Sequence, residues 1–227
     1  MTGEAAESRA ERARAALLRL LAWTSPGFPT GAFACSHGLE WAVEAGDITD
    51  EAGLRAWLED VLVHGAGRAD AILLRHAHQA AHAPDRLAAL AELATAAVPA
   101  RERRSETVDL GTAFAAAAAP WQPPWLPPAA PYPIALGALA GAHGIDPDDA
   151  VAAHLQAFAA NLISAAVRLV PLGQSSGLRV LAALEPAIRR VTEATSGATL
   201  DDLGTAAFRS DLAAMRHETQ YTRLFRT

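Results

Sequence analysis

The chain has 227 residues, of which 51% are hydrophobic and 19% are charged, and its formal net charge at pH 7 is -6. A chain of this size most often forms one large domain, and its scattered basic residues do not form the charged stripe of a nucleic-acid-binding protein. All 19 basic residues are arginines. Without lysine, the chain has neither a P-loop nucleotide site nor a Schiff-base nucleophile.

Two further features bear on location. No apolar run approaches the roughly 20 residues that a membrane-spanning helix needs. The first residues, MTGEAAESRAERARAALLRLLAW, carry alternating charges instead of a signal-peptide pattern, and a single cysteine excludes an intrachain disulfide. We therefore expect a cytoplasmic protein that contacts no membrane and no nucleic acid.

Helical periodicity dominates the sequence. Ala, Leu, Arg and Glu recur at spacings of three and four residues, and no alternating strand pattern occurs. The pattern predicts an all-α, single-domain bundle of about ten helices, over residues 9–23, 36–46, 50–66, 68–82, 85–97, 100–118, 133–143, 147–170, 174–195 and 210–217. We expect a flexible N-terminal extension over residues 1–14, the helical domain over 15–214, and a separate tail over 215–227.

The stretch SPGFPTGAFACSHGLEW, residues 25–41, gathers the residue types of a catalytic site. Cys35 and His37 are two residues apart, however, and would point to different faces of a helix. We expect Ser36 to cap the following helix and Gly38, one turn into it, to pack closely against a neighbouring backbone. The alternative is a helical cysteine hydrolase that pairs Cys35 with a distant histidine, such as His64 or His143.

Three histidines occur close together in RHAHQAAH. His78 and His82 are four residues apart on one helical face, a spacing that can present two metal ligands. His76 lies nearby, but the glutamate of the HExxH motif and an obvious third ligand are missing. A nickel-binding protein built on these histidines remains an alternative, and solvated histidines are the simpler interpretation.

The stretch ARERRSETVDLG, residues 100–111, is rich in charge. Glu102 and Glu106 are one helical turn apart, and neighbouring arginines can offset their repulsion. We interpret the stretch as a solvated helix face, with a partner surface as the alternative.

A proline-rich stretch occupies residues 119–133 and holds seven of the 14 prolines between Pro120 and Pro133. Since proline disrupts helices, we expect a long surface loop there. Trp121, Trp125 and Tyr132 within it either mark a docking surface or lie back on the body.

Further along, RLVPLGQSSGLRVL predicts a tight joint between two helices, since Pro171 ends one helix and Gly173 permits a turn. With so few glycines and no lysine, it is a poor phosphate-binding loop.

The chain finishes with MRHETQYTRLFRT, in which large apolar residues alternate with arginines. Tyr and Arg dominate the energetics of protein interfaces, whereas a free tail has little use for large side chains. We expect this tail to order on a partner; the alternative is a tail folded back on its own core.

Taken together, these stretches resemble the UreF family of urease accessory proteins. The resemblance rests on SPGFPTGAFACSHGLEWAVEAG, ARERRSET, YPIALGALAGAHGI, RLVPLGQSSGLRVLAALEP and DLAAMRHETQYTRLFRT, in this order. Family members often carry tyrosine where this chain has Cys35, so a hydrogen bond from that hydroxyl is not expected here.

The resemblance implies an all-helical homodimer without catalytic residues, cofactor or resident metal of its own. It implies that the chain joins UreD, also called UreH, and the GTPase UreG on apo-urease, where the complex handles nickel and promotes its insertion while the GTPase is regulated. The partner-binding residues that it implies are His37, Glu40, Arg168, Pro171, Gly173, Gln174, Arg216, His217, Glu218, Tyr221, Arg223, Leu224 and Phe225.

Overall fold

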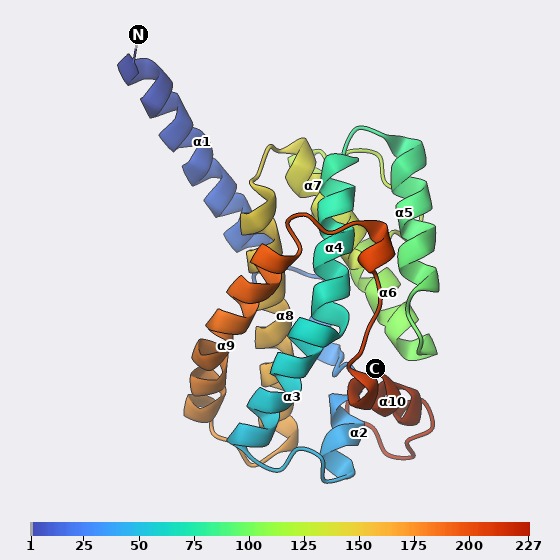
Figure 1. Ribbon diagram of the computed structural model, residues 1–227. Coiled ribbons are helices and arrows are strands. Elements are labelled where there is room, and N and C mark those ends of the chain that lie inside the picture. Colours follow the sequence, from blue (N-terminus) through green and yellow to red (C-terminus); the bar gives the residue numbers. More distant parts are fainter. Residues whose placement is uncertain (1) are drawn as a thin grey trace.

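The computed structural model describes residues 2–227, and within that range helices are the only regular secondary structure (Figure 1). The all-α expectation is confirmed. The helices are α1 (Thr2–Trp23), α2 (Leu39–Glu44), α3 (Glu51–His64), α4 (Ala66–Gln79), α5 (Pro84–Ala96), α6 (Arg101–Ala117), α7 (Tyr132–Ala142), α8 (Pro147–Leu169), α9 (Gln174–Ala194) and α10 (Phe208–His217), with 3-10 turns η1 (Ala32–Ala34), η2 (Ala119–Trp121) and η3 (Leu200–Asp202).

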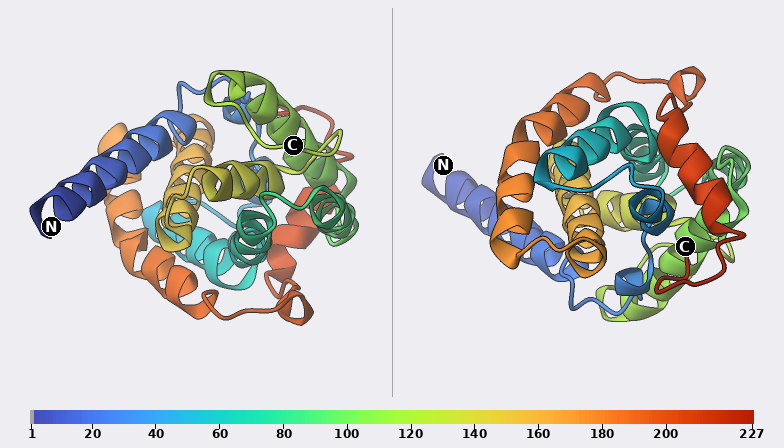
Figure 2. Two further views of the ribbon diagram at one scale, coloured as in Figure 1. Left: turned by 90° about the horizontal axis from the view of Figure 1, so that it is seen from above. Right: turned by 90° about the horizontal axis from the view of Figure 1, so that it is seen from below.

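Helix α7 lies at the centre, and the other helices surround it when the molecule is viewed along its length (Figure 2). Eight consecutive residues of α7, 133–140, are buried, as expected for a helix that is apolar on all sides. Helix α4 packs along α7, and α3 and α8 both pack against α9. The main core therefore joins α3, α4, α7, α8 and α9.

Helix α8 differs from one expectation. By length and composition it could cross a membrane, with a mean hydropathy of 1.5 in its most apolar stretch, although the sequence was expected to hold no such run. Half of that stretch is buried against the rest of the protein. The buried half of this stretch is part of the main core.

Helix boundaries follow the capping residues. The Asp50 carboxylate accepts a hydrogen bond from the Gly53 amide at 2.8 Å, so Asp50 caps α3. Pro84 opens α5, one residue before the predicted start at residue 85, because proline suits the first position of a helix. At the N-terminus, α1 extends back to Thr2, beyond the predicted helix start at residue 9, and it stands away from the body in Figure 1. The flexibility expected for residues 1–14 stays a prediction. The Ala, Glu and Arg residues of α1 are strong helix formers, which accounts for the longer helix.

The proline-rich stretch forms a loop from the end of η2 to the start of α7, as expected. Trp121 lies on the body, with its ring centroid 6.0 Å from that of Trp23 in an edge-on arrangement. Tyr132 begins α7 and packs edge-on against Phe114 at 5.4 Å. Trp125 remains 53% exposed.

Candidate interaction site

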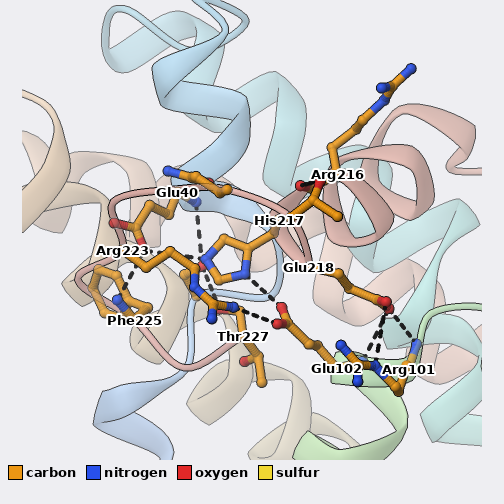
Figure 3. A network of polar contacts seen from close by, with 12 residues as sticks. Glu40, Arg101, Glu102, Arg216, His217, Glu218, Arg223, Phe225 and Thr227 are labelled. Atoms are coloured by element: carbon orange, nitrogen blue, oxygen red, sulfur yellow. Dashed lines mark hydrogen bonds and ion pairs between the residues drawn. The ribbon is translucent and has the colours of Figure 1, made fainter.

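Residues 218–227, which we call the C-terminal strap, follow α10 and fold back across α2 and α6 (Figure 3). The Arg226 amide donates to the Ala34 carbonyl at 2.8 Å, and the Ser36 amide donates to the Thr227 carbonyl at 2.7 Å. Our expectation that this tail needs a partner in order to become ordered is wrong for the isolated chain. Buried anchors on its own body hold it in place.

Glu40 on α2 is the first anchor. Its side chain is 8% exposed, and its carboxylate accepts hydrogen bonds from the amides of Leu224, at 2.6 Å, and Phe225, at 2.9 Å. Two consecutive backbone N–H groups thus converge on one buried carboxylate, which compensates part of its lost hydration. The Phe225 side chain is buried, and the neighbouring Leu224 side chain points outward and is 64% exposed.

His217, the last residue of α10, is the second anchor. Its side chain is fully buried, with Nδ1 2.6 Å from Glu102 Oε2 and Nε2 3.2 Å from Glu40 Oε2 (Figure 3). The other oxygen of Glu102 accepts a hydrogen bond from Arg223 at 2.6 Å. One imidazole therefore connects α10, α2 and α6, and Arg223 adds a contact from the strap to α6.

Glu106, one turn along α6 from Glu102, forms a third anchor. Its carboxylate lies 3.1 Å from His37 Nδ1 and accepts a short hydrogen bond from the Thr227 hydroxyl. Arg103 lies 3.7 Å away on the same helix, and the buried hydroxyl of Ser36 donates to the Thr227 carbonyl at 2.6 Å. The last residue of the strap is therefore held by both its backbone and its side chain.

The strap also caps α6. The helix begins after Ala100, which has no side-chain oxygen to accept from the first amides. Glu218 takes this role, because its Oε1 accepts from the amides of Arg101, at 2.7 Å, and Glu102, at 3.3 Å. A carboxylate at this end is also favoured by the helix dipole.

The turn before α2 corrects one expectation and confirms another. Helix α2 begins at Leu39 instead of Ser36, and His37 and Gly38 both adopt left-handed backbone angles, with φ of 61° and 75°. A Cβ atom at Gly38 would lie 2.5 Å from the Ala214 amide nitrogen. The close packing expected at Gly38 is therefore real, but it occurs in a turn against α10.

The interpretation of residues 100–111 as a solvated face is wrong for the side chains that carry the site. Glu106 is buried, and the side chains of Glu102 and Arg103 are only 13% and 11% exposed. Glu102 and Glu106 were not among the site residues predicted from the sequence. A signal was present: counting back by fours from the buried Phe114 leads to Leu110, Glu106 and Glu102, which share one helix face.

The predicted site residues fall into two groups. His37, Glu40, His217 and Phe225 are buried beneath the strap, whereas Arg216, Tyr221, Arg223 and Leu224 are exposed. The exposed residues adjoin α10, where Phe208, Leu212 and Met215 are 69%, 57% and 42% exposed and share a face by their spacing of four and three. The arrangement is chemically suited to protein binding, with an apolar surface held on a buried polar frame.

Arg168 joins the strap to the α8–α9 joint. Its guanidinium donates to the Phe33 carbonyl at 2.8 Å and lies 4.4 Å from the centroid of the Phe225 ring. The residues of the joint itself, Pro171, Gly173 and Gln174, are exposed. The sequence prediction of a tight helix-to-helix joint is confirmed by the three-residue break between α8 and the cap of α9.

Cys35 does not have the environment of a nucleophile. It is 7% exposed, and burial, together with the charge of Glu106, raises the pKa of its thiol to about 11. A thiol with that pKa stays protonated at neutral pH, whereas the thiolate is the reactive species. Of the two histidines considered as its partners, His143 lies 2.7 Å from the Trp121 carbonyl and His64 is exposed.

The histidines of α4 lie within hydrogen-bond distance of backbone carbonyls. His76 Nε2 lies 3.2 Å from the Ala198 carbonyl, and His78 Nε2 lies 2.7 Å from the Ile145 carbonyl. Within residues 2–227, no group of three or more His, Cys, Asp or Glu side chains is arranged to hold a metal ion. These contacts fix the loops that follow α7 and α9.

Comparison with known proteins gives one consistent family. A family model described as UreF matches residues 48–185. Proteins named urease accessory protein UreF are similar over nearly the whole chain. That of Bradyrhizobium sp. (strain BTAi1 / ATCC BAA-1182) is 51% identical, and the match covers 93% of this chain and 92% of the relative. That of Cereibacter sphaeroides (strain ATCC 17029 / ATH 2.4.9) is 54% identical, and the match covers 94% of this chain and 99% of the relative. The Methylobacterium radiotolerans protein of the same name is 50% identical, covering 92% and 96%.

Proposed function

Because this chain belongs to the UreF family, we propose that it is a urease accessory protein, a cytoplasmic scaffold without catalytic activity of its own. Its role is to promote nickel insertion into apo-urease, with nickel as the cargo of the assembled complex. The buried, protonated Cys35 thiol supports a non-enzymatic role.

The strap is the observation that carries this proposal. It presents Tyr221, fully exposed, and Leu224, 64% exposed, on a backbone that buried carboxylates fix in position. Preorganisation lowers the entropic cost of binding, and an exposed tyrosine beside apolar side chains is typical of an interface hot spot. We assign this surface and the outer face of α10 to UreD (UreH).

The remaining partners follow from the same family role. We propose that the chain forms a homodimer, that the complex with UreD recruits the GTPase UreG to apo-urease, and that the chain regulates the GTPase. The lack of lysine supports a division of labour, because the chain cannot build a P-loop and depends on a partner for GTP hydrolysis.

Co-purification tests the partners. The tagged chain is co-expressed with UreD alone, with UreG alone, and with both, and it is purified with and without GTP. We expect capture of UreD without nucleotide and capture of UreG when UreD is present. Urease activity in cells that lack the native gene provides the functional readout, and failure of the chain to restore it, together with failure to capture either partner, would overturn the proposal.

The Cys35→Ser variant distinguishes the scaffold from the hydrolase. A scaffold that folds normally should restore urease activity with this variant, because the thiol touches no reactant. A cysteine hydrolase would lose its activity completely.

A further inference from the structure

A cavity of about 410 Å³ lies where residues 23–33 meet α4, α6, α7 and α8. The continuous stretch from Trp23 to Phe33 forms one part of its lining, and side chains of the four helices form the rest. The volume falls within the roughly 300 to 1,000 Å³ of small-molecule sites. The glycine- and proline-rich sequence TSPGFPTGAF therefore borders a space in which a small ligand can bind.

Aromatic side chains supply the apolar part of the lining. They are Trp23, Phe28, Phe33, Tyr132 and Phe158. Trp23 is buried, whereas Phe33 is 70% exposed, which places Phe33 at the opening of the cavity. Walls of this kind favour a ligand with an apolar body, and they leave few groups to replace the hydration of a charge.

Two polar side chains in the lining are short of hydrogen-bond partners. Nε and Nη1 of Arg103 and Nδ1 of His154 are buried and have no hydrogen-bond partner among the residues that the structure describes. Nη1 of Arg103 lies 3.7 Å from Glu106 Oε1, which is too far for a hydrogen bond. His154 is 2% exposed, and its other ring nitrogen lies 3.3 Å from Asp70. Because a buried polar group without a partner costs free energy, these atoms point to a polar ligand.

The charges on the lining oppose one another. Glu106 already meets His37 and the Thr227 hydroxyl, which leaves Arg103 and Asp70 as the pair that faces a ligand. Arg103 offers only donors, and an ionised Asp70 offers only acceptors. An anion beside Asp70, or a cation beside Arg103, would bring like charges together in poorly hydrated surroundings. An uncharged ligand with one acceptor and one donor satisfies both side chains.

We propose that this cavity binds a small uncharged molecule with an apolar body and a carboxamide head. The carbonyl oxygen of the head accepts from Arg103, and its N–H donates to the Asp70 carboxylate. The aromatic side chains pack against the apolar body. This inference goes beyond the proposed scaffold role and does not depend on it.

The test compares three probes that share a benzene ring and differ in their polar group: benzamide, benzoate and benzylammonium. Each probe is titrated at neutral pH into the uniformly ¹⁵N-labelled full-length protein, and NMR follows the amides of Phe28 and Gly31 in the cavity wall. We expect saturable shifts of these amides with benzamide. Its dissociation constant should be at least tenfold lower than that of either charged probe.

A charge variant sharpens the comparison. Asp70→Asn removes the negative charge that opposes Arg103 and keeps the shape of the side chain. Benzoate should therefore bind this variant at least tenfold more tightly than it binds the wild type. Asp85→Asn is the matched control, because Asp85 is exposed on α5, and it should leave all three affinities unchanged.

Binding of benzoate or benzylammonium to the wild type as tightly as benzamide would overturn the proposal. Unchanged Phe28 and Gly31 amides with all three probes would also overturn it, since the cavity would then hold ordered water only. An unchanged benzoate affinity of folded Asp70→Asn would contradict the assigned role of Asp70. The probe series on the wild type decides the proposal even if this variant does not fold.

Discussion

His217 and Glu40 are 177 residues apart in the sequence, yet the imidazole Nε2 of one lies 3.2 Å from a carboxylate oxygen of the other. The contact joins the end of α10 to the start of α2, and from Glu40 it continues to the backbone of Leu224 and Phe225. A buried polar contact between distant residues thus holds the backbone of the strap at the surface.

Replacing Glu40 tests the support. Glu40→Ala removes the acceptor of two amides and the partner of a buried imidazole, so we expect a loss of about 3 to 5 kcal/mol in the free energy of unfolding. Urea unfolding followed by circular dichroism measures it. Glu59→Gln, in an exposed ion pair with Arg190, is the control and should change stability by less than about 1 kcal/mol. Equal effects of the two variants would contradict the assigned role of Glu40.

Two glycines with similar backbone angles test the close packing of the turn before α2. Gly38 and Gly46 have φ of 75° and 80°, but an added Cβ meets the Ala214 backbone at 2.5 Å only at Gly38, and at Gly46 it meets nothing within 4 Å. Gly46→Ala should cost about 1 kcal/mol of backbone strain. Gly38→Ala adds a clash with backbone atoms and should lower the melting temperature clearly further.

The two neighbouring residues Leu224 and Phe225 separate burial from exposure within the strap. Phe225 is 4% exposed and lies under the Arg168 guanidinium, so Phe225→Ala should cost about 3 kcal/mol and increase proteolysis of the strap. Leu224→Ala should leave the free energy of unfolding within about 0.5 kcal/mol of the wild type. The opposite order of effects would mean that the strap packs in another way.

Cys35 gives a pH prediction. Burial raises the pKa of its thiol from 9.0 to about 11, so the unfolded chain loses this proton at lower pH than the folded chain does. The resulting contribution to stability is complete below pH 9 and is lost as the pH rises to about 11.

The measurement compares Cys35→Ala with the wild type between these pH values. Over this range the wild type should lose about 2 kcal/mol more stability than the variant, which lacks the titrating group. Parallel curves would show that the thiol titrates equally in both states.

The helical framework could be predicted from the sequence because its signals are local. Asp50, Pro84 and the Asp146–Pro147 pair mark helix starts through capping and proline geometry, and the structure places helices at all three. The start of α2 was misplaced although Ser36 has the chemistry of a cap. Its hydroxyl accepts from the Glu40 amide at 3.3 Å, but it does so from three residues before Leu39, and it also donates to the Thr227 carbonyl, 191 residues away.

The site could be predicted only in part, because its contacts join residues that are far apart in the sequence. The types of residue in the tail indicate an interface, but whether Phe225 is buried against the chain itself depends on α2, α6 and α8 meeting in space. Glu102 and Glu106 look solvated in the sequence because charged residues usually are. Their burial becomes favourable only once His217, His37, Arg223 and the strap amides surround them.

The central claim is that the exposed side of the strap binds UreD while the buried side holds it in shape. Its most direct test is the affinity of UreD for the Tyr221→Ala/Leu224→Ala double variant, measured by biolayer interferometry beside Leu178→Ala, which removes a leucine that is 68% exposed on α9. We predict wild-type stability for both variants, an affinity at least tenfold weaker for the double variant, and unchanged affinity for Leu178→Ala. Wild-type affinity of the folded double variant would contradict the account.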